Sequence, residues 1–171
     1  MDDRRPADDD RGVELDLLTL LPRLTQLGQV LHRSGLMERA MERVGIAIDR
    51  PGMSILVTLR MSDRPLRIGE IAERMQVVGP HVTRQMNELE RRDLARRVVD
   101  PQDQRARLIE LTSEGAAVAD RYLRTILGWF TDALAAWSPQ DRQSFGRLLG
   151  RFADDLTAHL AALDDDLPPA P

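Results

Sequence analysis

The spacing of apolar residues predicts three helices in the first part of the chain. Leucines recur at helical intervals through residues 15–33, and a shorter apolar face follows in residues 36–46. Asp49, two positions before Pro51, is typical of a helix start, because aspartate caps free backbone N–H groups and proline fits the first turn. A third helix is therefore expected from this point to about Met61.

The middle of the chain contains shorter elements. The predicted elements are an extended stretch at residues 66–68, a short helix at 69–75, a tight turn at 76–79, a helix at 80–92, and β-rich segments at 94–99 and 107–111. The two β-rich segments flank the polar residues 100–105 and therefore predict a hairpin. Two helices joined by a turn and followed by a hairpin indicate a winged helix-turn-helix.

Two longer helices are predicted to close the chain. Thr112 is a capping residue with Glu114 in the first turn, and its helix should run to about Ala136. Residues 138–141 mark a second start, for a helix that reaches about Leu163. We expect this last helix to bury its apolar residues, which are Phe145, Leu148, Leu149, Phe152, Leu156 and Leu160. The predicted fold class is mainly α with a small β-hairpin.

The composition is that of a folded protein without cysteine chemistry. The chain has 171 residues, of which 42% are hydrophobic, enough for one compact domain or a small domain with an extension. Cysteine is absent, which excludes disulfides, thiolate nucleophiles and thiol redox switches. No apolar run approaches the roughly 20 residues that span a bilayer, and the acidic N-terminus does not resemble a secretory signal. We therefore expect a cytoplasmic protein that does not act at membranes.

The distribution of charge changes the meaning of the acidic total. The chain carries 24 basic residues, all arginine, and 28 acidic ones, for a net charge of -4. Residues 64–107 contain ten arginines and seven acidic residues, a net of +3, which leaves -7 for the remainder. Acidic runs and prolines cluster at residues 1–12 and 164–171, which we expect to be disordered. The basic charge therefore lies in the predicted winged helix.

The helix at residues 80–92 has the two faces that a DNA-reading helix needs. Val82, Met86 and Leu89 fall on one side and are expected to face inward. The opposite side and its flanks carry Pro80, His81, Thr83, Arg84, Gln85, Asn87, Glu88 and Arg91. Arginine suits guanine and asparagine suits adenine in the major groove, while Thr83 and the backbone N–H groups near Gly79 suit phosphates. The alternative is an ordinary solvated helix face, which Glu88 favours unless it pairs with Arg84, Arg91 or Arg92.

The predicted hairpin favours DNA binding. Gln102, Gln104 and Arg105 stand at its tip, and a narrow minor groove attracts arginine. Further arginines lie on its strands, at Arg96, Arg97 and Arg107. Asp103 is expected to hold an arginine of the wing and so to stiffen the tip, although a turn-forming aspartate is the simpler alternative.

These segments together resemble the MarR family of winged-helix transcriptional regulators. The resemblance covers roughly residues 15–163, and its most specific parts are residues 66–72, 82–94, 100–105 and 111–115. It implies a homodimer whose first and last helices interlock. It also implies a pseudo-palindromic operator, with recognition helices in successive major grooves and wings in the minor groove. Family members commonly repress a neighbouring gene and are released by small anionic or aromatic ligands.

The resemblance also implies a division of the chain. The expected parts are a disordered acidic tail at 1–12, dimerisation helices at 13–50, the winged helix-turn-helix at 51–111, dimerisation helices at 112–163 and a disordered tail at 164–171. By position, Thr83 and Arg84 match recognition-helix contacts, Arg105 matches the minor-groove contact, and Asp103 matches the wing-bracing acid. Two departures are Pro80-His81 at the helix start and Asp93 where a glycine is usual.

Two sets of candidate site residues follow. The expected DNA contacts are Gly79, Pro80, His81, Thr83, Arg84, Asn87, Arg91, Gln104, Arg105 and Arg107. An effector pocket is expected between the dimer helices and the winged helix, near His32, Met37, Met53, Arg60 and Trp129. For the pocket the alternative is simple core packing, since methionine at helical spacing is usually buried.

Other chemistry receives little support from the residues. His32 and Ser34 are neighbours without any nucleophile-elbow pattern, no glycine-rich phosphate loop is present, and no enzyme activity or cofactor is expected. Asp155 and His159 lie four apart, which is too weak a signal to predict a metal site. The leading hypothesis is a dimeric DNA-binding regulator that acts as a repressor. The alternatives are a winged helix that docks onto another protein and a small-molecule carrier or enzyme.

Overall fold

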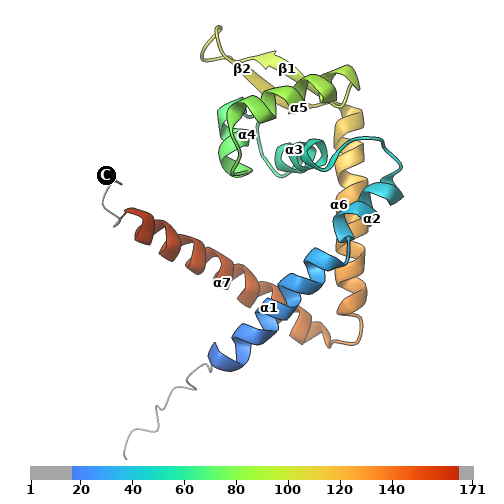
Figure 1. Ribbon diagram of the computed structural model, residues 1–171, viewed down its shortest axis with the longest axis vertical. Coiled ribbons are helices and arrows are strands. Elements are labelled where there is room, and N and C mark those ends of the chain that lie inside the picture. The colour runs from blue at the N-terminus through green and yellow to red at the C-terminus, as the bar shows by residue number, and fades with distance from the viewer. Residues whose placement is uncertain (1–16, 166–171) are drawn as a thin grey trace, which may run out of the picture. The chain divides into compact units, whose positions relative to one another are not determined.

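The structure, a computed structural model, describes residues 17–165 and confirms a mainly α fold with a small β-hairpin (Figure 1). The elements are α1 (Leu17–Arg33), α2 (Leu36–Val44), α3 (Arg50–Arg60), α4 (Ile68–Arg74), α5 (Gly79–Arg91), β1 (Ala95–Val99), β2 (Arg107–Leu111), α6 (Ser113–Ala133) and α7 (Pro139–Asp165). The predicted tails at 1–12 and beyond Asp165 lie outside the described residues.

The chain forms two compact units, one ending at Leu123 and the other beginning at Arg124. The first unit contains the winged helix, whose core lies among α3, α4, α5, the hairpin and the start of α6 (Figure 1). Its largest fully buried side chains are Met53, Ile55, Leu56, Leu66, Ile71, Val82, Met86, Leu89, Leu94, Ile109 and Val118. One short stretch of chain therefore supplies a complete hydrophobic core.

The start of α3 forms as its sequence predicts. The Asp49 side chain accepts a hydrogen bond from the Gly52 N–H at 2.9 Å, and Pro51 lies in the first turn. The other carboxylate oxygen of Asp49 accepts from the Gln85 side chain at 2.8 Å. The cap of α3 is thereby joined to α5.

The predicted hairpin forms and is extended by one bridge. Its antiparallel ladder runs from Ala95 opposite Leu111 to Val99 opposite Arg107. Leu66 adds an isolated bridge to Ile109 through hydrogen bonds of 3.0 and 2.7 Å. The expected extended stretch at residues 66–68 is correct only at its start, because α4 already begins at Ile68.

A tight corner joins the end of α5 to the start of α6. The Thr112 hydroxyl donates to the Asp93 carbonyl at 2.6 Å and accepts from the Gly115 N–H at 3.0 Å. A Cβ added at Gly115 would lie 1.7 Å from the carbonyl oxygen of Leu94, so only glycine fits there. Asp93 has a φ of 53°, the left-handed conformation that glycine adopts most readily. The Leu-Thr-x-x-Gly pattern at residues 111–115 is thus a packing requirement.

The two closing helices differ from the prediction. α6 ends at Ala133, three residues before the expected Ala136, and α7 continues to Asp165, two residues into the expected tail. The predicted burial along α7 is wrong for the single chain: Phe145, Leu148, Leu149, Phe152, Leu156 and Leu160 each expose 40–55% of their surface. Helical spacing correctly identifies the apolar face, but the described chain supplies no surface that covers it.

Candidate nucleic-acid interface

α4 and α5 form the helix-turn-helix. Between them, Gln76 adopts a φ of 54°, and the Val77 N–H donates to the Ala72 carbonyl at 2.9 Å. Val82, Met86 and Leu89 each expose 1% or less, which confirms the predicted inner face of α5. The rest of the helix is consequently turned to solvent, and Pro80, His81, Thr83, Arg84, Asn87 and Arg91 are all exposed.

Most arginines of the winged helix are neutralised by a carboxylate. The ion pairs join Arg64 to Glu70, Arg67 to Asp100, Arg91 and Arg92 to Glu88, Arg96 to Glu110, and Arg97 to Glu90. The hydrogen bond from Arg92, together with both guanidinium charges, lowers the pKa of Glu88. Glu88, which would favour an ordinary solvated face if it were unpaired, is therefore paired and does not present an uncompensated negative charge.

Two exposed arginines at the predicted DNA contacts have side chains without a hydrogen bond or ion pair among the described residues. Arg84 lies on the outer face of α5, and Arg105 lies at the hairpin tip. Arg74, at the end of α4, is a third unpaired arginine of the winged helix. Unpaired guanidinium groups keep all their donors available for a ligand. The structure thus separates arginines that hold the fold from arginines that are free to bind.

Several of the other predicted contact residues have side chains that are bonded within the protein. The Thr83 hydroxyl donates to the Gly79 carbonyl at 3.2 Å, and Arg107 donates to the Gln104 carbonyl at 2.9 Å. Asn87 accepts a hydrogen bond at its Oδ1 from Arg97 Nη2 at 2.9 Å. This bond fixes the amide so that the NH₂ group of Asn87 remains the free donor. Asn87 is accordingly better suited to an acceptor than to the bidentate adenine contact suggested by its residue type.

Within the loop of the wing, the acid that holds an arginine side chain is Asp100, and that arginine, Arg67, lies at the start of α4. Asp103 instead accepts from the backbone N–H of Arg105 at 3.0 Å, which orders the tip through a turn. Asp100 exposes only 6% of its surface and accepts from Arg67 Nη2 at 2.6 Å and from the Gln102 N–H at 2.9 Å. These hydrogen bonds lower its pKa, with the backbone bond making the larger contribution. Sequence reasoning missed Asp100, although an aspartate before a proline at the start of a polar turn was an available signal.

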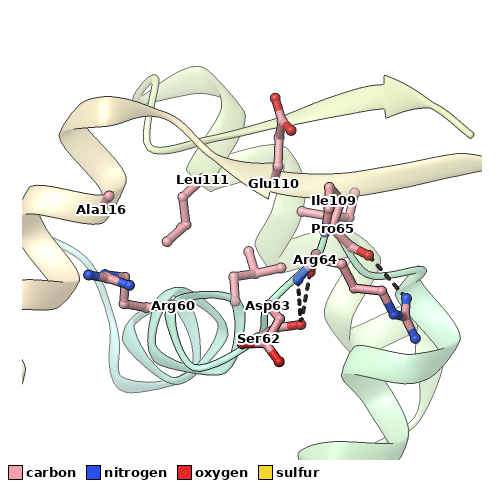
Figure 2. Close-up of a pocket in the computed structure, with 10 residues that line it drawn as sticks. Arg60, Ser62, Asp63, Arg64, Pro65, Ile109, Glu110, Leu111 and Ala116 are labelled. Carbon is pink, nitrogen blue, oxygen red and sulfur yellow. Dashed lines mark hydrogen bonds between the residues drawn. The ribbon is translucent and has the colours of Figure 1, made fainter.

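One of the predicted effector residues, Arg60, borders a hollow in the first compact unit. A hollow of about 280 Å³ lies between the end of α3, residues 62–65, β2 and Ala116, and among the five predicted residues it contains only Arg60 (Figure 2). Arg60 Nε donates to Asp120 Oδ1 at 2.7 Å. Met53 is a core residue, exposed by 1%, and the sulfur of Met37 accepts from the Tyr122 hydroxyl at 2.8 Å. His32 is exposed at the end of α1, and Trp129 belongs to the second compact unit.

The described residues contain neither a cluster that could bind a metal ion nor a helix that could span a membrane. Within residues 17–165, no group of three histidine or acidic residues is arranged to hold a metal ion. Asp155 pairs with Arg151 at 3.4 Å on the same helix. None of the described helices combines the length and the apolar character needed to cross a bilayer.

Comparison with known proteins places the chain in a family. The model of the MarR family matches residues 48–106, from just before α3 to the hairpin loop. The chain is 30% identical over 142 residues to the uncharacterised HTH-type transcriptional regulator YxaD of Bacillus subtilis, a match that spans 82% of this chain and 90% of YxaD. The chain belongs to the MarR family. The resemblance noted in the sequence is confirmed, and the chain is a winged-helix transcriptional regulator by family.

Solved MarR structures share the fold. A MarR family protein from Bacillus stearothermophilus is 19% identical with a TM-score of 0.67, over 82% of this chain and 97% of that protein. A mutant of MepR from S. aureus, bound to an oligodeoxyribonucleotide, is 21% identical with a TM-score of 0.52, over 81% of this chain and 97% of that one. At these identities the comparison supports the winged-helix fold and not the individual contacts.

Proposed function

We propose that this MarR protein is a homodimeric repressor that reads a pseudo-palindromic DNA operator. The observation that supports this most strongly is the pair of unpaired, exposed arginines at the two predicted reading positions, Arg84 on α5 and Arg105 on the wing tip. Arg84 contacts guanine in the major groove, and Arg105 enters the minor groove. The complete proposed interface is Gly79, Pro80, His81, Thr83, Arg84, Asn87, Arg91, Gln104, Arg105 and Arg107.

The proposed interface residues differ in whether their side chains are free to bind DNA or are already bonded within the protein. Arg84 makes the main base contact because no carboxylate competes for its donors. Arg91 is bound to Glu88, and Arg107 is bound to backbone carbonyls, so these two contribute phosphate contacts at the margins. Asp103 holds the backbone of Arg105 and so shapes the tip that carries the minor-groove contact.

The exposed apolar faces of α1 and α7 support the homodimer. Leu21, Leu24, Leu27 and Val30 of α1 each expose 53–62% of their surface, and the apolar residues of α7 are similarly uncovered. Contiguous exposed apolar faces of this kind are typical of surfaces that bind another protein chain. We propose that residues 13–50 and 112–163 supply the dimer contacts and that residues 51–111 read the DNA. A two-fold dimer then places the two winged helices on inverted half-sites.

Release by a small aromatic or anionic ligand completes the proposal. A ligand shifts the dimer away from DNA only if it binds the DNA-incompetent arrangement more tightly than the competent one. Arg60, at the hollow of Figure 2, is the one predicted pocket residue that combines exposure with a cationic group. A thermal-shift screen with phenolic and other aromatic acids tests this step, and Arg60→Gln should remove the shift of any acid that binds there.

An electrophoretic shift assay tests the proposed function itself. The wild-type protein is added to the duplex upstream of its own gene, with a shuffled duplex of equal length as the control. We expect preferential binding of the upstream duplex, with an affinity that falls steeply as salt rises. Equal binding of both duplexes contradicts sequence-specific recognition. If no duplex is bound and a partner protein is instead recovered with the winged helix, the protein-interaction alternative replaces the proposal.

A further inference from the structure

Arg67 connects the helix-turn-helix to the wing across a long interval of sequence. It lies at the N-cap of α4, and its Nη2 donates to Asp100 Oδ2 at 2.6 Å, 33 residues further along the chain. Among the described residues, Asp100 is the one buried charged side chain. A buried carboxylate needs partners, and removal of one partner leaves the other uncompensated. The pair is therefore a specific attachment and not a chance surface contact.

Asp100 organises the wing loop as well as binding Arg67. Its Oδ1 accepts from the Gln102 N–H at 2.9 Å, and its carbonyl accepts from the Asp103 N–H at 3.2 Å. The Asp100 N–H donates to the Ala106 carbonyl at 3.3 Å. Asp103 in turn holds the backbone of Arg105. A short chain of hydrogen bonds thus leads from Arg67 to the backbone of the wing arginine.

Hydrogen bonds also hold Arg67 itself in place at the start of α4. The Arg67 N–H donates to Glu70 Oε2 at 2.7 Å, and Glu70 is held by Arg64. The hydrogen bonds from Arg64 and from the Arg67 backbone lower the pKa of Glu70 to about 2. The paired strands end at Val99 and Arg107, so the loop beyond them projects past the sheet. Arg67 therefore attaches the base of a projecting loop to a rigid helix start.

We propose that Arg67 is a positioning residue for DNA binding, which acts through Asp100 to hold the wing at a fixed offset from the recognition helix. This proposal rests on the proposed function, because it assumes that Arg105 contacts DNA. A contact in the major groove and a contact in the minor groove both add fully to the affinity when the protein already holds them at the right separation before it binds. Arg97 still ties β1 to Glu90 and Asn87 of α5 without the attachment, but the loop at the wing tip moves relative to α5, and Arg105 contributes less to binding.

A double-mutant comparison tests the proposal with a matched control. Arg64→Gln and Arg67→Gln each remove one half-exposed arginine from the same segment, but only Arg67 reaches the wing. The probe is a duplex that the wild-type protein selects from a random-sequence pool. We expect about a tenfold loss of affinity for Arg67→Gln, less than about twofold for Arg64→Gln, and almost no further loss when Arg67→Gln is added to Arg105→Ala.

The protection pattern on the same duplex distinguishes positioning from general stability. With Arg67→Gln, minor-groove protection from hydroxyl radicals at the wing should be lost while guanine N7 remains protected in the major groove. Asp100→Asn, which keeps an oxygen for the Gln102 N–H, should give the same pattern. Equal losses with and without Arg105→Ala overturn the proposal, because they indicate that Arg67 touches a phosphate itself or merely stabilises the fold. If the wild type selects no sequence, the proposed function fails as well.

Discussion

Apolar side chains are buried in the winged helix but exposed along the two terminal helices, α1 and α7. In the winged helix, apolar side chains such as Ile55, Leu56 and Met86 are fully buried within one chain. Along α1 and α7, apolar residues at equally regular spacing remain about half exposed, as at Leu24 and Phe152. Within residues 17–165, one chain therefore contains a winged helix with a complete core together with helices whose apolar faces lack a cover. The difference predicts that substitutions in the first region affect folding, while those in the second affect association.

The largest expected effect comes from the corner between the hairpin and α6. Gly115→Ala places a Cβ 1.7 Å from the Leu94 carbonyl, so the backbone must shift, at a cost of about 3 kcal/mol in the free energy of unfolding. Gly69→Ala is the control, because a Cβ at Gly69 meets nothing within 4 Å and should stabilise the helix by up to about 1 kcal/mol. Urea unfolding at fixed protein concentration measures both. Equal stability of the two variants contradicts the close approach.

The second prediction concerns the uncovered face of α7. Leu156→Glu places a charge in the middle of the apolar stripe, and we expect it to weaken dimerisation by at least about 2 kcal/mol per subunit. Gln143→Glu adds the same charge on the opposite side of the helix and should leave the dimer intact. Sedimentation equilibrium gives the molecular mass, and circular dichroism shows that the winged helix stays folded. A Leu156→Glu protein that keeps the wild-type mass rules out α7 as the dimer interface.

The third prediction separates base reading from general charge. Arg84→Ala should cost about 1–3 kcal/mol of binding to the selected duplex and relax the preference at one base position. Arg74→Ala removes another unpaired arginine of the helix-turn-helix and should weaken binding only slightly, by a similar factor for every sequence. Fluorescence anisotropy on the selected duplex and on single-base variants measures both effects. Identical profiles for the two variants contradict a base contact by Arg84.

The smallest expected effect is a pH dependence within the winged helix. The pKa of Glu70 is about 2, below its ordinary value of 4.5, so its ion pair stabilises the fold fully above about pH 4.5. That contribution declines as the pH falls from 4.5 towards 2. Because both partners are partly exposed, we expect it to amount to about 1 kcal/mol or less. Glu70→Gln should reduce the loss of stability between about pH 5 and pH 3. An unchanged acid slope in urea unfolding contradicts this role.

The pattern of residues close together in the sequence was sufficient to predict the elements of the winged helix. The inner face of α5 followed from the spacing of Val82, Met86 and Leu89, and the start of α3 followed from Asp49 and Pro51. These features depend on neighbouring residues, and neighbouring residues determine helix faces and caps. The exposed positions of Arg84 and Arg105 were predicted for the same reason.

Contacts across long intervals were not predictable in this way. The choice of Asp100 over Asp103 as the arginine-binding acid depends on Arg67, which only the folded chain brings near. Likewise, Arg67, Arg96 and Arg97 pair with acids that lie 33, 14 and 7 residues away in the sequence.

Local spacing allowed Glu88 to pair with Arg84 as well as with Arg91 and Arg92, and only the folded chain shows that Arg84 is left free. Helical periodicity also does not say whether a face is covered by its own chain or by another. That ambiguity produced the wrong expectation for α7.

The most direct test is to let the wild-type protein select its binding sites from a pool of random duplexes. This selection tests both whether the winged helix reads a DNA sequence and whether the uncovered helix faces pair two chains. The prediction is an enriched motif made of two inverted half-sites with centres about one helical turn, or roughly 10 base pairs, apart. That result requires both sequence reading by the winged helix and two-fold pairing of the chains. A single half-site without its inverted copy contradicts the dimer, and a pool without any enriched motif contradicts sequence-specific binding.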